Sequence, residues 1–191
     1  AAAGSRTGAL TGLLQVHAPS AFGVSEVAPA VSDFMALHPQ LAVSLVLTDR
    51  FVDPLEEGYD VALHVGELGP SSLVSRKICP IRRLMCASPA YLDTHGRPRT
   101  PDDLSGHALL HHGSPGTSLS WPVRGAGSNG RLPVNPVLYS GNGDVLKTAC
   151  LAGRGITLLP AYTVADQLAA AELVPVLEGF EPRPFALHAV Y

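Results

Sequence analysis

The sequence has few cysteines and no long apolar segment. Its three cysteines, Cys79, Cys86 and Cys150, include no pair spaced as C-x-x-C. This argues against a disulfide framework or a zinc ribbon and predicts a reducing compartment, the cytoplasm. The longest apolar run, Leu41–Leu47, is far shorter than the roughly 20 residues that a membrane helix needs, so we expect no membrane partner. Residues 1–12 show no secretion signal, and we interpret them as a linker or a vector-derived segment.

Basic residues are also scarce. Thirteen Lys and Arg stand against sixteen Asp and Glu, which gives a net charge of -3 in 191 residues. Nucleic acid binding needs an excess of positive charge, so we expect DNA to be bound only through a domain outside this sequence. Hydrophobic residues make up 46% and charged residues 15%. This composition excludes a disordered chain and predicts apolar surface that self-association would cover.

The motifs for metal, nucleotide and nucleophile chemistry are absent or out of context. A G-x-G-x-x-G pattern at residues 125–130 precedes a predicted strand, not the helix that a dinucleotide site requires, so we interpret it as a flexible hairpin turn. His111 and His112 are adjacent and would point to opposite faces of a strand. The paired carboxylates at 56–57 and 102–103 are typical of helix ends. We expect no metal, no cofactor and no enzymatic activity.

The first third of the chain alternates strands with helices. Strands are predicted at 13–18, 41–48 and 61–65, and the nearly continuous apolar run of the second strand predicts burial on both faces. One helix is expected after the first strand and a very short one after the second. This order is typical of a parallel sheet with right-handed crossovers.

The helix ends follow from proline, glycine and capping residues. Pro29 fits only near a first turn, so the first helix is expected to begin nearer Ala28 than Phe22. Asp53, which precedes a proline, and Gly58 predict the two ends of the very short helix.

A second α/β unit and a lone final strand make up the remainder. We expect an extended stretch at 73–87, helices at 90–94, 145–152 and 160–170, and strands at 107–111, 119–123, 133–139, 155–159 and 185–190. The final strand has no helix of its own and is free to return to the first unit. The predicted fold class is α/β, with two lobes joined by two crossing strands around a cleft. Lobe I is expected at 13–85 plus 185–191, and lobe II at 86–184.

Two turns of similar composition follow predicted strands. They are residues 19–23 (PSAFG) and residues 140–144 (SGNGD). Each offers backbone N–H groups and a small polar side chain at the carboxyl end of a strand, where open α/β sheets bind ligands. Ser20 and Asn142 could equally be ordinary helix N-caps, so ligand binding and capping both stay open from these residues alone.

Several short phrases recur in a known order along the chain. They are GLL at 12–14, APSAFG at 18–23, FMALHP at 34–39, DRFVD at 49–53, EGYDVA at 57–62, SPAYL at 88–92, PDDL at 101–104, AGRGI at 152–156, LP at 159–160 and LVPVL at 173–177. With these phrases the chain resembles the effector-binding domain of LysR-type transcriptional regulators. The resemblance implies a fold like that of type 2 periplasmic binding proteins, with a small-molecule effector between two lobes. It also implies a homodimer or tetramer, and a DNA-binding winged helix-turn-helix domain upstream of this sequence.

The resemblance further implies a set of effector-binding residues. They are Ser20, Ala21, Phe22, His64 and Gly66 from lobe I, Asn142, Ile156 and Thr157 from lobe II, and Ala87 and Ser88 from the crossing strands. Relatives with the pattern Asp-x-Ala-x-Arg-x-Gly carry arginine where this chain has His64, so a fixed cation is replaced by a group that titrates near neutrality. His64 could equally be a strand-end histidine that faces solvent or the core. We expect a small monoanionic carboxylate whose binding tightens as pH falls from about 8 to about 6.

The resulting hypothesis is a non-catalytic, dimeric sensor domain of a transcription factor. Its dimer contact is expected at the helix around 31–38 and the edge around 51–57. The alternative is a solute-binding protein of a transporter, which shares the fold and would carry a secretion signal. An enzyme on the same fold would need a reactive cysteine, lysine or carboxylate in the cleft.

Overall fold

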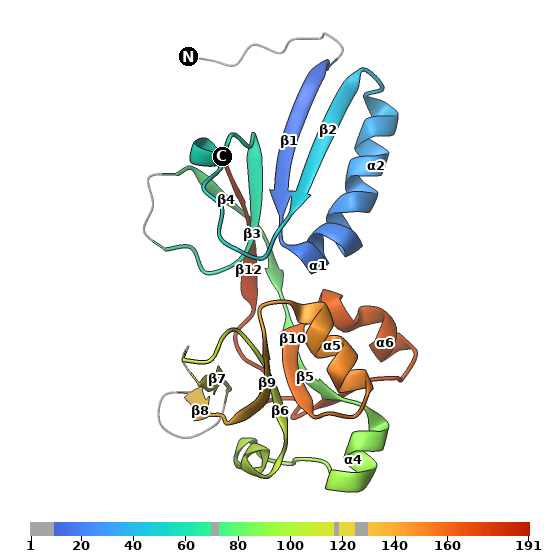
Figure 1. Ribbon diagram of the computed structural model, residues 1–191, viewed down its shortest axis with the longest axis vertical. Coiled ribbons are helices and arrows are strands. Elements are labelled where there is room, and N and C mark those ends of the chain that lie inside the picture. Colours follow the sequence, from blue (N-terminus) through green and yellow to red (C-terminus); the bar gives the residue numbers. More distant parts are fainter. Residues whose placement is uncertain (1–9, 70–72, 117–118, 125–129) are drawn as a thin grey trace. The chain divides into compact units, whose positions relative to one another are not determined.

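The computed structural model describes residues 10–69, 73–116, 119–124 and 130–191, which form two compact units (Figure 1). Unit 1 consists of the described residues up to His64, those within Gly69–Lys77, and His188–Tyr191; unit 2 consists of Val65–Leu68 and Ile78–Leu187. The predicted hairpin at 125–129 and residues 1–9 of the predicted linker lie outside the described residues. The lobe borders at 85/86 and 184/185 remain a prediction. Three borders between the two compact units fall at 64/65, 77/78 and 187/188, and each of these lies inside a strand.

The described strands form two five-stranded sheets and one small pair. In chain order they are β1 Gly12–Ala18, β2 Leu41–Leu47, β3 Val61–Gly66, β4 Ser75–Ile81, β5 Arg83–Ala87, β6 Leu109–His112, β7 Ser120–Pro122, β8 Arg131–Pro133, β9 Pro136–Ser140, β10 Ile156–Pro160, β11 Val174–Val176 and β12 Phe185–Val190. The first sheet has the order β2-β1-β3-β12-β4, the second has the order β11-β5-β10-β6-β9, and β7 pairs with β8. The final strand therefore joins the first sheet, as predicted.

Helical segments connect these strands. They are α1 Ser20–Phe22, the π-helix Gly23–Val27, α2 Ala28–Leu37, α3 Pro54–Glu57, α4 Pro89–His95, the 3-10 helix Pro101–Gly106, α5 Gly143–Leu151, the 3-10 helix Ala161–Val164 and α6 Ala165–Ala169. The predicted ends of α3 are confirmed: the Asp53 side chain accepts from the Leu55 and Glu56 N–H groups, and Gly58 has a φ of 77°. The α/β class is confirmed as well.

The parallel pairing expected for the first three strands is present, because β1 runs parallel to both β2 and β3. The prediction that β2 is buried on both faces is wrong. β2 is an outer strand of its sheet, and its residues are partly buried or exposed. A long apolar run cannot distinguish a central strand from an edge strand whose outer side is covered by something else.

The regular helix α2 begins at Ala28, as predicted from Pro29, but helical backbone already starts at Ser20, which was not predicted. Helical backbone continues from α1 through the π-helix into α2. The Ala28 N–H donates to the Gly23 carbonyl, a π-type bond. A proline ring collides with the preceding turn of a regular α-helix, and this wider turn just before Pro29 accommodates it.

Unit 2 has a dense core made of two buried clusters. The first includes Met85, Leu109 and Trp121, and the second includes Leu110, Leu146 and Leu159. These side chains are at most 2% exposed. Leu109 and Leu110 are neighbours on β6 and belong to different clusters, so the two clusters lie on opposite faces of the second sheet.

Candidate functional site

In unit 1 the turn after β1 is tied to the loop that follows β2. The Ser20 N–H donates to Asp49 Oδ1 at 2.8 Å, and the Thr48 N–H donates to the Ala18 carbonyl at 3.1 Å. Ser20 is the first residue of α1 rather than its N-cap; that position belongs to Pro19, which has no capping side chain. Within the described residues the Ser20 hydroxyl makes no hydrogen bond, so it is the group of this turn that a ligand could engage.

A glycine sets how closely this turn approaches the sheet. A Cβ atom on Gly23 would lie 2.2 Å from Cδ2 of Leu47. The absence of a side chain at Gly23 therefore lets the helix start lie directly on β2. Phe22, 8% exposed, provides an apolar wall next to Ser20 and the partly buried Ala21.

His17 contacts the loop after β2, to which this turn is hydrogen-bonded. It is 2% exposed, its Nε2 lies 2.8 Å from Thr48 Oγ1, and its Nδ1 is buried with no hydrogen-bond partner within the described chain. Burial lowers the pKa of His17, and the positive charge of Arg50 lowers it further. Arg50 is itself held in a two-pronged ion pair with Glu57. His17 is therefore a neutral hydrogen-bonding partner of the loop after β2.

His64 lies near the carboxyl end of β3, and β3 is parallel to β1. Parallel strands end at the same edge of a sheet, so His64 and Ser20 belong to the same edge of the first sheet. The His64 ring packs edge-on against Phe51, with 5.5 Å between centroids. Gly66 ends β3, is buried, and falls in unit 2.

In unit 2 the second turn caps a nine-residue helix, which confirms the capping interpretation for Asn142. Asn142 Oδ1 accepts from the Asp144 N–H at 2.9 Å and from the Val145 N–H at 3.3 Å. Asp144, in the first turn, forms an ion pair of 2.7 Å with Lys147. The negative charge at this helix start is thus balanced by a neighbouring cation.

Thr163 was not anticipated from the sequence. It is 6% exposed, and its hydroxyl is buried with no hydrogen-bond partner within the described chain. A Cβ atom on Gly143, the first residue of α5, would lie 3.4 Å from the Thr163 methyl group. Thr163 therefore borders the start of α5. Only the packing of the 3-10 helix against α5 reveals this, because the two segments are far apart in sequence.

Four expected effector residues lie elsewhere in unit 2, namely Ala87, Ser88, Ile156 and Thr157. β6 and β9 run parallel to β10, and β5 runs antiparallel to it. Asn142 follows the carboxyl end of β9, whereas the carboxyl end of β5 and the amino end of β10 lie at the opposite edge of this sheet.

These four residues have structural contacts where they are. Ala87, Ile156 and Thr157 are fully buried. The Thr157 hydroxyl donates to the Leu110 carbonyl at 3.1 Å, and Ser88 is the N-cap of α4. The structure therefore does not bring them together with Asn142.

His111 forms a polar contact in the core of unit 2. Its Nδ1 accepts from the Trp121 indole N–H at 3.0 Å, and its ring lies edge-on to Tyr139. Burial, and then His112, lower the pKa of His111. His111 is buried and His112 exposed, so the two face opposite ways as predicted. In the described part of the chain no three His, Cys, Asp or Glu side chains are grouped so that they could hold a metal ion.

The G-x-G-x-x-G pattern leads into a strand, as predicted. Residues 131–133 form β8, so the helix that a dinucleotide site needs does not follow it. Within the described ranges, no helix has the length and apolar character needed to span a membrane.

Comparison with known proteins places the chain in a family. Residues 7–191 match the model of the LysR substrate binding domain. An HTH-type transcriptional regulator of Haemophilus influenzae, itself uncharacterized, is 35% identical over 97% of this chain and 64% of its own length. The HTH-type transcriptional regulator CrgA of Neisseria meningitidis is 32% identical over 94% of this chain and 60% of its own length. The chain thus spans about three fifths of the length of these curated relatives.

Solved structures agree. The regulatory domain of CrgA from Neisseria meningitidis superposes with a TM-score of 0.85 and 31% identity, over 95% of this chain and 89% of that domain. Full-length AphB of Vibrio cholerae, described as a virulence activator, gives a TM-score of 0.81 and 29% identity, over 95% of this chain and 62% of that chain. The binding-protein-like α/β fold implied by the resemblance is confirmed, and the chain belongs to the LysR substrate-binding domain family.

Proposed function

We propose that this chain is the effector-sensing domain of a LysR-type transcription factor. The observation that carries the proposal is the match to the CrgA regulatory domain over nearly the whole of both chains. In the full-length protein a small molecule bound here would control DNA binding through a separate helix-turn-helix domain. The domain itself would be non-catalytic and would act in the cytoplasm. The transporter alternative has less support, because the matching relatives are transcriptional regulators.

We propose that the Ser20 turn and the Asn142 turn both contribute to effector binding, together with Ala21, Phe22, His64 and Gly66. The Ser20 hydroxyl, without a partner in the described chain, supports a ligand contact. Ala87, Ser88, Ile156 and Thr157 would influence the effector only through packing, since they are already engaged in the core of unit 2.

A small carboxylate is the ligand class that we propose to test first. The start of α5 supports it, because the helix dipole favours an anion there and Lys147 balances Asp144. The Ser20 turn supports it less, because its first N–H already donates to the Asp49 carboxylate. We therefore assign the carboxylate group to the Asn142 turn and a hydroxyl or other neutral polar group of the effector to Ser20.

The experiment is differential scanning fluorimetry against small carboxylates, each paired with its primary amide. The proposal predicts that a carboxylate stabilises the chain and that its amide does not. Asn142→Asp keeps an acceptor for the helix cap but adds a negative charge, so it should weaken carboxylate binding by about tenfold without unfolding the chain. Ser20→Leu should abolish binding, whereas Ser75→Leu, on exposed β4, is the matched control. Amides that stabilise as well as acids would contradict the ligand class.

A variant of His64 provides a second test of the same site. A positive charge at His64 attracts an anionic effector even where the carboxylate itself contacts the Asn142 turn. His64→Arg should therefore tighten binding and reduce its dependence on pH between about 8 and 6. An affinity that does not change with pH in the unmodified chain would remove His64 from the proposed site.

We also propose that the domain dimerises through unit 1. None of the residues of α2 is buried, and Leu37 is 76% exposed. Phe51, which precedes α3, and Leu55, within α3, are 52% and 73% exposed. Large exposed apolar side chains at these two places support a surface that another chain covers.

A further inference from the structure

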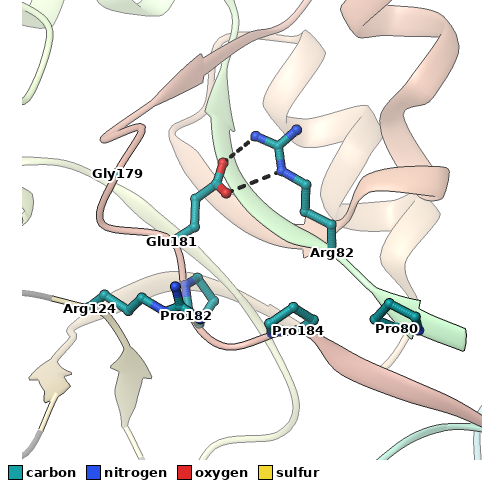
Figure 2. Close-up of a pocket in the computed structure, with 7 residues that line it drawn as sticks. All are labelled: Pro80, Arg82, Arg124, Gly179, Glu181, Pro182 and Pro184. Carbon is teal, nitrogen blue, oxygen red and sulfur yellow. Dashed lines mark hydrogen bonds and ion pairs between the residues drawn. The ribbon is translucent and has the colours of Figure 1, made fainter.

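Unit 2 contains a pocket that the proposed effector site does not use. Its volume is about 350 Å³, and it is lined by three prolines, two arginines, one glutamate and one glycine (Figure 2). All seven residues belong to unit 2, and none of residues 140–144 is among them. A volume near 350 Å³ is at the small end of ligand pockets, and is suited to a molecule built on a single ring.

One side of the pocket is apolar and rigid. Pro80 comes from β4, and Pro182 and Pro184 come from the segment before β12. In the view of Figure 2 the three proline rings form a row beside the charged residues. Proline rings have little conformational freedom to lose and carry no N–H group, so they favour a compact apolar body over a polar one.

The other side carries an ion pair that is already satisfied. Arg82 donates to Glu181 from Nε at 3.1 Å and from Nη2 at 2.5 Å, and Figure 2 shows both contacts. The Glu181 side chain is 24% exposed and that of Arg82 is 58% exposed. The carboxylate is therefore neutralised within the pocket wall, while Arg82 keeps further N–H donors.

Arg124 adds a positive charge that no carboxylate balances. Its backbone N–H donates to the Phe180 carbonyl at 3.1 Å, which joins it to the pocket-lining segment. No carboxylate of the described chain pairs with its guanidinium, and residues 1–9, 70–72, 117–118 and 125–129 contain no Asp or Glu. With Arg82, Glu181 and Arg124 together, the lining carries one net positive charge.

We propose that this pocket is a second ligand site that binds a small organic monoanion, with its carboxylate on Arg124 and its compact apolar ring against the prolines. The net charge selects an anion, the proline wall selects an apolar body, and the volume limits the ligand to about one ring. The site is independent of the proposed effector site and does not require that proposal to be correct.

The test is calorimetric titration of the 191-residue chain with benzoate and with its neutral isostere benzamide. Benzoate should bind, and benzamide should bind at least about tenfold more weakly, since it lacks the charge-assisted contact. Arg124→Gln should weaken benzoate by about tenfold and leave benzamide unchanged. Glu181→Gln should act in the opposite direction and tighten benzoate severalfold, because the net charge of the lining rises.

Two control variants distinguish binding in this pocket from a general effect of charge and from binding at the Ser20 turn. Arg76→Gln makes the same change of total charge at an exposed position of β4 and should alter benzoate affinity by less than about twofold. Ser20→Leu should leave benzoate binding intact. Loss of binding in Ser20→Leu would mean that benzoate occupies the proposed effector site, and absent binding, equal binding of benzamide, or an unchanged Arg124→Gln variant would each overturn the proposal.

Discussion

The two units differ in how much of their apolar surface they bury by themselves. Among the largest fully buried side chains of the described residues, all but Val190 belong to unit 2. Unit 1 instead has α2 without a buried residue and β2 as a partly buried outer strand. The difference indicates that unit 2 is stabilised by its own core, whereas α2 of unit 1 is left for the proposed dimer contact to cover. The predictions below test that contrast.

The largest effect is expected from truncating a core side chain in unit 2. Leu146, on α5, is fully buried, whereas its neighbour Val145 is 48% exposed. Leu146→Ala should lower the free energy of unfolding by about 2 to 5 kcal/mol, because it removes buried surface and leaves a cavity. Val145→Ala is the matched control and should change it by less than about 0.5 kcal/mol. Urea denaturation measures both free energies of unfolding. Similar midpoints for the two variants would contradict the claim that unit 2 is stabilised by its own core.

Two glycines, one in each unit, allow the two units to be compared by the cost of adding a Cβ atom where the backbone is closely packed. A Cβ on Gly155, in unit 2, would lie 2.3 Å from the Ala108 carbonyl oxygen, and Gly155 has a φ of 149°. A Cβ on Gly23, in unit 1, would meet only the flexible end of the Leu47 side chain. Gly155→Ala should therefore cost about 3 kcal/mol or more, and Gly23→Ala about 1 kcal/mol. Chemical denaturation of the two variants measures the difference. If Gly23→Ala were the less stable of the two, the expectation that unit 2 is the more tightly packed unit would be wrong.

These glycines also show what the sequence could and could not predict. Capping residues act on their immediate neighbours, so the ends of α3 and the cap of α5 could be predicted from Asp53, Gly58 and Asn142. The helix start at Ser20 could not, because it depends on a π-turn that relieves the clash of Pro29. A local pattern does not contain this rearrangement.

The candidate site shows the same limit. Ser20 and Asn142 could be located because each follows a strand directly. Ile156 and Ala87 could not be placed, because their position depends on β5 running antiparallel to β10. Thr163 was missed for a related reason, since it meets Gly143 only through tertiary packing.

Self-association is the next comparison, and it concerns unit 1. Leu37→Asp should weaken dimerisation by at least about tenfold, because it places a charge on the uncovered face of α2. Leu119→Asp introduces the same charge at a position of unit 2 that is 41% exposed, and should leave the dimer intact. Sedimentation over a range of concentrations distinguishes the two. A monomer in the unmodified chain, or a dimer broken by Leu119→Asp alone, would remove the proposed contact.

The smallest effect is expected from pH, and it reaches both units. Burial is the main cause that lowers the pKa of His17 in unit 1 and of His107 and His111 in unit 2 from the ordinary value of 6.5. The folded chain then binds fewer protons than the unfolded chain below that value. Their contribution to stability is therefore complete above about pH 6.5 and is lost as pH falls toward the lowered pKa values.

The two units should respond through different histidines. His111 has to stay neutral to accept from the Trp121 indole, so acid should release Trp121, the chain's single tryptophan, and change its fluorescence. His111→Gln keeps an acceptor but does not titrate, and should flatten the fluorescence change between about pH 7 and 5, whereas His112→Gln should not. His17→Gln should flatten the loss of global stability measured by circular dichroism while leaving the Trp121 signal unchanged. If His17→Gln altered the Trp121 signal instead, the two units would titrate as one cooperative structure and the contrast between them would not extend to their response to acid.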